Sequence, residues 1–170
     1  NIVKFAEGSD FQIVDGVFYN GTVLETVLDN TLTAVNVLPG TEKIADGAFN
    51  RNDSSGGPAL TSLTSVILPD TLTSIGTNSF YNCVSLNSIN FPSSLEEIGM
   101  NAFSNTALES IVLPGNVKTI GEWAFSNTEL TTVILSEGIE EIPTGAFAGV
   151  STLKTVVIPA SVKTIGKNAF

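Results

Sequence analysis

Histidine is absent from the 170 residues of the chain, and there is a single cysteine, Cys83. Sites that need imidazole or several thiolates, such as His/Cys zinc centres, Ser-His-Asp triads and Cys-His dyads, are therefore excluded. An intramolecular disulfide is excluded as well, because it needs two cysteines. No run of spaced carboxylates of the kind that calcium requires is visible. We therefore expect no metal site, no cofactor and no catalytic residue.

Basic residues are also scarce. Seven lysines and arginines stand against seventeen acidic residues, which gives a net charge of −10. Nucleic acids and anionic membrane surfaces are recognised through basic patches, so the charge argues against both as partners. No apolar run approaches the ~20 residues that a membrane-spanning helix needs, and we expect no membrane insertion within this segment.

Apolar residues are plentiful by contrast, at 42% of the chain, while only 14% of the residues are charged. This balance is not that of an intrinsically disordered chain, and 170 residues are enough for one domain with a full core. Threonine, serine, asparagine and glycine take the places that charged residues usually hold. The composition thus indicates a folded domain with an uncharged polar surface.

Phenylalanine recurs at intervals of 22 or 23 residues, after one longer first interval of 31. A second column, of isoleucine, lies five residues before each of the last five phenylalanines. Repeats of this length are typical of stacked coils, because one unit cannot bury its apolar face alone. We predict that both columns form the repeat core, namely Phe49, Phe80, Phe103, Phe125, Phe147 and Phe170 with Ile75, Ile98, Ile120, Ile142 and Ile165.

The sequence between successive phenylalanines predicts two short strands and a corner. A unit opens with a leucine and places apolar residues three and five positions later, as in Leu108, Ile111 and Leu113. This alternation predicts a short strand with one buried face. A proline then ends that strand, because it has no N–H to donate. After the phenylalanine, a residue such as Asn105 tolerates the left-handed backbone of a corner, so each unit of about 22–23 residues predicts one coil.

The units that begin at Leu63, Leu86, Leu108 and Leu130 resemble the BspA-type leucine-rich repeat in their leucine, proline, Ile-Gly and Ala-Phe positions. Serine replaces the proline once, at Ser136. The resemblance implies a mainly β fold, a right-handed leucine-rich-repeat solenoid of short parallel strands. It also implies a place on a bacterial or protist cell surface and a role in adhesion.

The two ends of the chain differ from each other. Residues 1–30 lack the repeat and hold the hairpin dipeptides Asp15-Gly16 and Asn20-Gly21, so we predict an N-terminal β-hairpin or meander cap there. Residues 31–170 form the repeat region of about six coils, with a flexible insertion at 51–59. The repeat frame stops within a unit at Phe170, and we expect further repeats or a cap to follow in the full protein.

A column of outward-pointing residues on the first strand of each coil is a candidate protein-binding face. It consists of Ile67, Asn90, Val112, Ile134 and Val157, flanked by serine and threonine. An exposed apolar stripe framed by hydroxyls suits a protein partner. The alternative is that the β-branched residues only stabilise the sheet by packing across strands. We add Trp123 to the face, as a partly exposed aromatic residue that could anchor a protein or a carbohydrate.

Charges alternate in another column, which holds Glu96, Lys118, Glu140 and Lys163. This column predicts a ladder of salt bridges between neighbouring coils. The alternative is a carboxylate cluster for acid–base chemistry at the Glu96/Glu97 or Glu140/Glu141 pairs. Adjacent residues of a strand point to opposite faces, which argues against such a cluster. For Cys83, a small buried thiol is favoured over a reactive one.

Together these features favour a non-catalytic, extracellular binding or adhesion module of a bacterial surface protein. Its expected partner is a surface or matrix protein of a host or a neighbouring cell. The competing hypothesis is a structural spacer that displays other domains. A remote alternative is an accessory domain of a polysaccharide-acting enzyme. Function rests here largely on the family resemblance.

Overall fold

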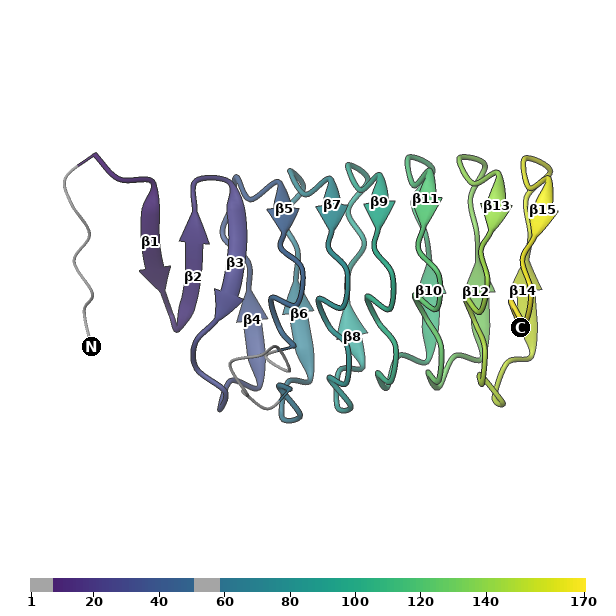
Figure 1. Cartoon of the computed structure of the whole chain (residues 1–170), viewed down its shortest axis with the longest axis horizontal. Helices are drawn as coiled ribbons and strands as arrows, with labels where there is room; N and C mark the ends of the chain where they lie inside the picture. The colour runs from purple at the N-terminus through teal and green to yellow at the C-terminus, as the bar shows by residue number, and fades with distance from the viewer. Residues whose placement is uncertain (1–7, 51–58) are drawn as a thin grey trace.

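The computed structural model describes residues 8–50 and 59–170, so residues 51–58 of the predicted insertion lie outside it. Within that part of the chain all regular elements are strands, stacked side by side into one long array (Figure 1). Each coil contributes two short strands, and the two sets form two rows along the array. The predicted solenoid of parallel strands is confirmed. Among the described residues no helix is long and apolar enough to cross a membrane.

The first strand row contains one strand from each coil, placed where the alternating leucine frame predicted it. Its strands are β4 (Ala34–Asn36), β6 (Ser65–Ile67), β8 (Ser88–Ile89), β10 (Ser110–Val112), β12 (Thr132–Ile134) and β14 (Thr155–Val157). In β10 the middle residue, Ile111, is buried and its neighbours are exposed, as the alternation requires. The strands pair in parallel, so equivalent residues of successive coils lie beside each other.

The second strand row follows the proline position and carries the isoleucine column. Its strands are β5 (Lys43–Ile44), β7 (Ser74–Ile75), β9 (Glu97–Ile98), β11 (Thr119–Ile120), β13 (Glu141–Ile142) and β15 (Thr164–Ile165). They also pair in parallel, with isoleucine opposite isoleucine where the ladder is intact. Each row is interrupted once: the first between β8 and β10, the second between β11 and β13.

Three longer strands, β1 (Phe11–Val14), β2 (Val17–Asn20) and β3 (Val23–Val27), form an antiparallel meander before the first coil. The first turn is at Asp15-Gly16, where both residues have positive φ. The meander joins the solenoid through β3, which pairs in parallel with β5. Tyr19 of β2 and Leu24 of β3 are fully buried, so the meander covers the end of the core at the first coil.

The phenylalanine column forms a continuous stack of rings through the centre of the solenoid. Neighbouring ring centroids lie 4.4 to 5.6 Å apart along the column, and most pairs are nearly parallel. Five of the six phenylalanines and four of the five isoleucines are buried, as predicted. Ile165 and Phe170, the last members of the two columns, are 55% and 50% exposed. They lie on the last described coil, where no further coil packs on them.

The corners use left-handed backbone, as the asparagine and glycine column predicted. Asn82, Asn105, Asn127 and Gly149 all have φ between 52° and 73°. Asn105 Nδ2 also donates a 2.7 Å hydrogen bond to Asn82 Oδ1, so the corner side chains link one coil to the next. The corner residues therefore contribute to stacking as well as to the turn.

Candidate functional site

The four apolar members of the predicted binding face all reach solvent. Their exposed fractions are 60% for Ile67, 62% for Val112, 36% for Ile134 and 48% for Val157. The last three are brought together by register, because Val112 pairs with Ile134 and Ile134 with Val157. Side chains in such positions lie about 4.8 Å apart. We call Val112, Ile134 and Val157 the apolar stripe.

Asn90 interrupts the column between Ile67 and Val112. Strand β8 ends one residue before it, and the first strand row is broken between β8 and β10. The Asn90 side chain turns to the backbone of Leu68, where Oδ1 accepts from the N–H at 2.7 Å and Nδ2 donates to the carbonyl at 2.9 Å. The structure therefore places Ile67 within a separate sheet and Asn90 just beyond the end of a strand of that sheet, so the predicted five-member face is divided into two parts.

Trp123 lies apart from the stripe, at a corner of the fourth full coil. It is partly exposed and has a φ of 60°, in a column that otherwise holds Gly47, Asn78, Asn101, Gly145 and Asn168, all with positive φ. A bulky residue with positive φ is a true outlier. The indole leans over Gly145, where an added Cβ would come within 2.4 Å of its ring carbons. One part of the ring thus packs on the next coil and the rest faces solvent.

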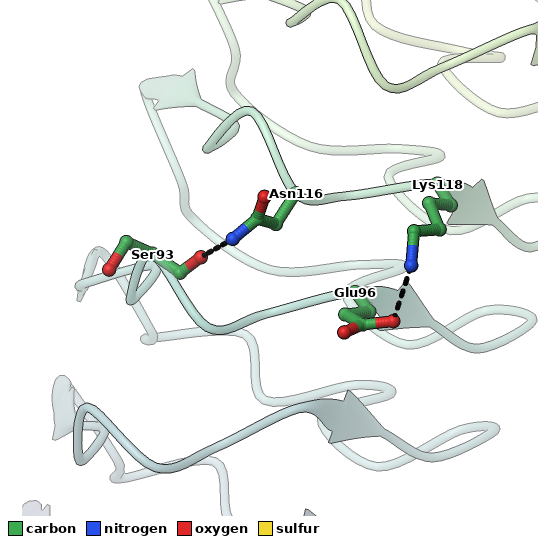
Figure 2. A network of polar contacts seen from close by, with 4 residues as sticks. All are labelled: Ser93, Glu96, Asn116 and Lys118. Carbon is green, nitrogen blue, oxygen red and sulfur yellow. Dashed lines mark hydrogen bonds and ion pairs between the residues drawn. The ribbon is translucent and has the colours of Figure 1, made fainter.

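The charged column forms two separate ion pairs rather than one ladder. Lys118 Nζ lies 2.7 Å from Glu96 Oε2, as Figure 2 shows, and Lys163 Nζ lies 2.9 Å from Glu140 Oε1. Beside the first pair, Asn116 Nδ2 donates to the Ser93 carbonyl at 2.7 Å. All four charged side chains are about half exposed or more, so each pair contributes only about 0–1 kcal/mol.

The Glu140/Glu141 pair does not follow the predicted alternation of faces. Glu140 and Glu141 are both exposed and both line the same shallow groove on the second strand row. The expectation that neighbours in this strand point to opposite faces was wrong, because β13 is only two residues long and Glu140 precedes it. Within the described part of the chain, no three acidic or thiol side chains converge to hold a metal ion.

Cys83 is fully buried, as predicted. Its Sγ lies 3.7 Å from the carbonyl oxygen of Phe49, the residue one coil before. Burial raises the pKa of the thiol to about 12, although a main-chain hydrogen bond opposes the shift. A thiol that stays protonated at neutral pH is a poor nucleophile, so Cys83 is a packing residue.

Sequence reasoning missed a groove along the second strand row, which is lined by glycines and carboxylates. Among the last five units, Pro143 is the one replacement in the glycine column, at a place where other units have Gly76, Gly99 and Gly121. That substitution could have indicated a break in the strand ladder beside the groove, because proline has no N–H to donate to the neighbouring coil.

The chain is similar to one family of known proteins. The model of the BspA type leucine rich repeat region matches residues 59–170 in six copies. No curated protein resembles the chain closely enough to count as a relative.

Solved structures of bacterial repeat proteins are similar to the chain over nearly its whole length. A leucine rich cell surface protein from Faecalibacterium prausnitzii is 29% identical with a TM-score of 0.74; the match covers 100% of this chain and 46% of that one. The pneumococcal vaccine antigen PcpA is 25% identical with a TM-score of 0.70, over 97% of this chain and 41% of the antigen.

The leucine rich repeat protein of T. pallidum is 23% identical with a TM-score of 0.63, over 96% of this chain and 85% of that one. At this identity the likeness concerns the fold alone. The chain thus spans most of the T. pallidum protein but less than half of the other two.

Proposed function

The chain belongs to the BspA-type leucine-rich repeat family of bacterial surface proteins, and from this premise we propose that it is a non-catalytic, extracellular protein-binding module used in adhesion. The F. prausnitzii relative, described as a cell surface protein, supports the surface location. The partner we propose is a surface or matrix protein of a host or neighbouring cell. Repeat proteins of this kind present extended, rigid surfaces to their ligands.

The observation that carries the proposal is the apolar stripe. Three β-branched side chains stand in register on β10, β12 and β14 and remain at least 36% exposed. Hydroxyl residues lie beside them in the same strands, at Ser110, Thr132 and Thr155. An apolar centre with a polar rim is the usual composition of a protein interface.

The second candidate function is a spacer, and the continuous core favours it. The coils stack from the meander to the last described strand around one continuous hydrophobic core, which makes a stiff array. In that case the β-branched residues of the stripe stabilise the sheet by packing across strands and have no partner.

The isolated chain distinguishes the two functions. We would measure its binding to a panel of immobilised extracellular-matrix proteins and to cultured epithelial cells, by biolayer interferometry and flow cytometry. The binding-module proposal predicts saturable binding to at least one of them, while heat-unfolded chain does not bind. If the chain binds none of the matrix proteins and none of the cells, the spacer function is favoured.

A further inference from the structure

The apolar stripe is the centre of a larger surface patch that covers three neighbouring coils. In each coil, three residues that are not buried belong to it: the residue before the strand, the first residue of the strand and the member of the apolar stripe. The parallel register of β10, β12 and β14 places equivalent residues beside one another. We call this set the stripe patch, and it consists of Glu109, Ser110 and Val112 in the first coil, Thr131, Thr132 and Ile134 in the second, and Lys154, Thr155 and Val157 in the third.

The two charges of the stripe patch lie at its opposite ends. Glu109 precedes β10, Lys154 precedes β14, and the uncharged Thr131 lies between them. Main-chain hydrogen bonds fix this order, because the Thr131 N–H donates to the Glu109 carbonyl at 2.8 Å and the Lys154 N–H donates to the Thr131 carbonyl at 3.0 Å. Both charged side chains are exposed, and neither takes part in the two ion pairs of the described chain.

The stripe patch is complementary to itself under a two-fold rotation. When two copies face each other, an axis along β12 reverses the order of the coils, so that β10 of one copy lies opposite β14 of the other. Valine then faces valine, hydroxyl faces hydroxyl, and Glu109 faces Lys154 on both sides of the axis, while Ile134 lies on it. A two-fold interface between identical chains requires a patch that matches itself in this way.

The other two-fold axis of a face-to-face pair, along the stack of coils, gives no such match. It sets each coil against the same coil of the second copy with the strand direction reversed. Glu109 and Lys154 then face valines of the other copy, which removes water from a charge without supplying a partner. The positions of the charges therefore favour the arrangement in which the coils run in opposite order.

The size of the patch sets the strength of the contact. With coils about 4.8 Å apart, the patch measures about 10 Å across the strands and about 13 Å along them. Such a contact belongs to the weak, transient class of interfaces. The net charge of −10 on each copy also opposes association, although salt at physiological concentration screens charges more than about 8 Å apart.

We propose that the stripe patch docks a second copy of this chain, sheet against sheet, with the coils of the two copies in opposite order. The inference rests on the proposed use of the apolar stripe as a binding surface, and it names the partner as the same protein on a neighbouring cell. Two solenoids paired in this way run antiparallel, as do two chains that extend toward each other from facing surfaces. Many weak contacts between two surfaces then add up through avidity.

The test is sedimentation velocity of the purified chain from about 10 µM to about 1 mM, because a weak interface predicts a dissociation constant of about 0.1–1 mM. Glu109→Lys and Lys154→Glu should each raise this constant at least about fivefold, since each sets like charges against each other twice. The first variant makes the net charge less negative and the second makes it more negative. Constants that move in opposite directions would reduce the effect to net charge and overturn the proposal, as would a wild type that stays monomeric.

A mixture of the two variants tests the opposite order of the coils. In a mixed dimer every reversed charge again faces an opposite charge, so an equimolar mixture should associate within about twofold of the wild type. The double variant Glu109→Lys/Lys154→Glu should recover in the same way. Recovery also shows that each variant is folded, whereas a mixture and a double variant that both stay weak would refute the proposed pairing.

Failure of this inference can be told apart from failure of the proposed function. Binding to matrix proteins and cells is measured with dilute chain, below the concentration at which it pairs with itself. A chain that binds them but stays monomeric would overturn this inference alone. A chain that dimerises as predicted but binds no matrix protein supports the inference and contradicts only a foreign partner.

Discussion

Ser79 is a hydroxyl residue in a column of alanines. The equivalent residue of each other described coil is Ala48, Ala102, Ala124, Ala146 or Ala169. Ser79 is fully buried, and its Oγ has no hydrogen-bond partner among the described residues. A buried hydroxyl without a partner loses its hydration and gains nothing in return.

Replacing Ser79 with alanine is therefore expected to stabilise the protein. We expect Ser79→Ala to raise the free energy of unfolding by about 1 kcal/mol, measured by denaturant titration. Ser126→Ala is the matched control, because Ser126 Oγ lies 2.8 Å from Ser104 Oγ and 3.0 Å from the Trp123 carbonyl. This control should lose stability, and a loss in Ser79→Ala as well would contradict the structural account of the site.

Cys83 should make the free energy of unfolding fall as the pH rises above about 9. Its pKa is near 12 in the folded protein and 9.0 in the reference state, so the unfolded chain releases the proton first as the pH rises. The contribution of Cys83 to stability is thus complete below about pH 9 and is lost progressively between pH 9 and 12. Unfolding titrations of wild type and Cys83→Ala across this range should converge as the pH rises, and a constant difference would contradict the burial of the thiol.

At the scale of elements, the short strands and corners could be predicted, but the breaks between strands could not. Alternation predicted β10 and β12, and the asparagine column predicted the positive φ of residues such as Asn105. The breaks depend on whether neighbouring coils come within hydrogen-bonding distance, which is a property of two coils together. Pro143 indicated one break through its missing N–H, whereas the division near Asn90 has no comparable signal.

The corner of Trp123 and Gly145 is an element in which two coils constrain each other. Gly145 has a φ of 64°, and an added Cβ would also collide with the Trp123 indole. Gly145→Ala should cost more than about 2 kcal/mol of unfolding free energy in the wild type, and only about 1 kcal/mol in a Trp123→Asn background, where the backbone penalty alone remains. Equal costs in a double-mutant cycle of thermal or denaturant unfolding would contradict the contact.

At the scale of the whole molecule, the solenoid is a one-dimensional stack in which each coil is stabilised by its neighbours. The sequence predicted this architecture because the phenylalanine and isoleucine columns repeat without a change in spacing inside the unit. The exposure of Ile165 and Phe170 follows from their place on the last described coil, since burial of a coil depends on what packs against it.

The loss of stability on replacing a phenylalanine of the ring stack with alanine should therefore depend on the position of that phenylalanine. Phe103→Ala, which removes a fully buried ring between two others, should lower the free energy of unfolding by about 3–5 kcal/mol. Phe170→Ala, whose ring is half exposed, should lower it by about 1–2 kcal/mol. Equal losses measured by denaturant unfolding would mean that the stack is not organised as described.

The functional claim for the whole molecule is that a rigid sheet presents the apolar stripe to a protein partner. Val112 and Ile134 point out of the sheet and leave the core untouched, so their replacement by aspartate should preserve the fold. The matched control is Ile67→Asp, a similarly exposed residue on the separate sheet.

The most direct measurement is the binding of Val112→Asp/Ile134→Asp to whichever immobilised matrix protein or cell the wild-type chain binds saturably, with unfolding curves recorded in parallel. We predict a loss of affinity of at least about tenfold in the double variant, a small change in Ile67→Asp, and a near-native unfolding transition in both. Unchanged binding by the folded double variant would contradict the assignment of the apolar stripe as the binding surface.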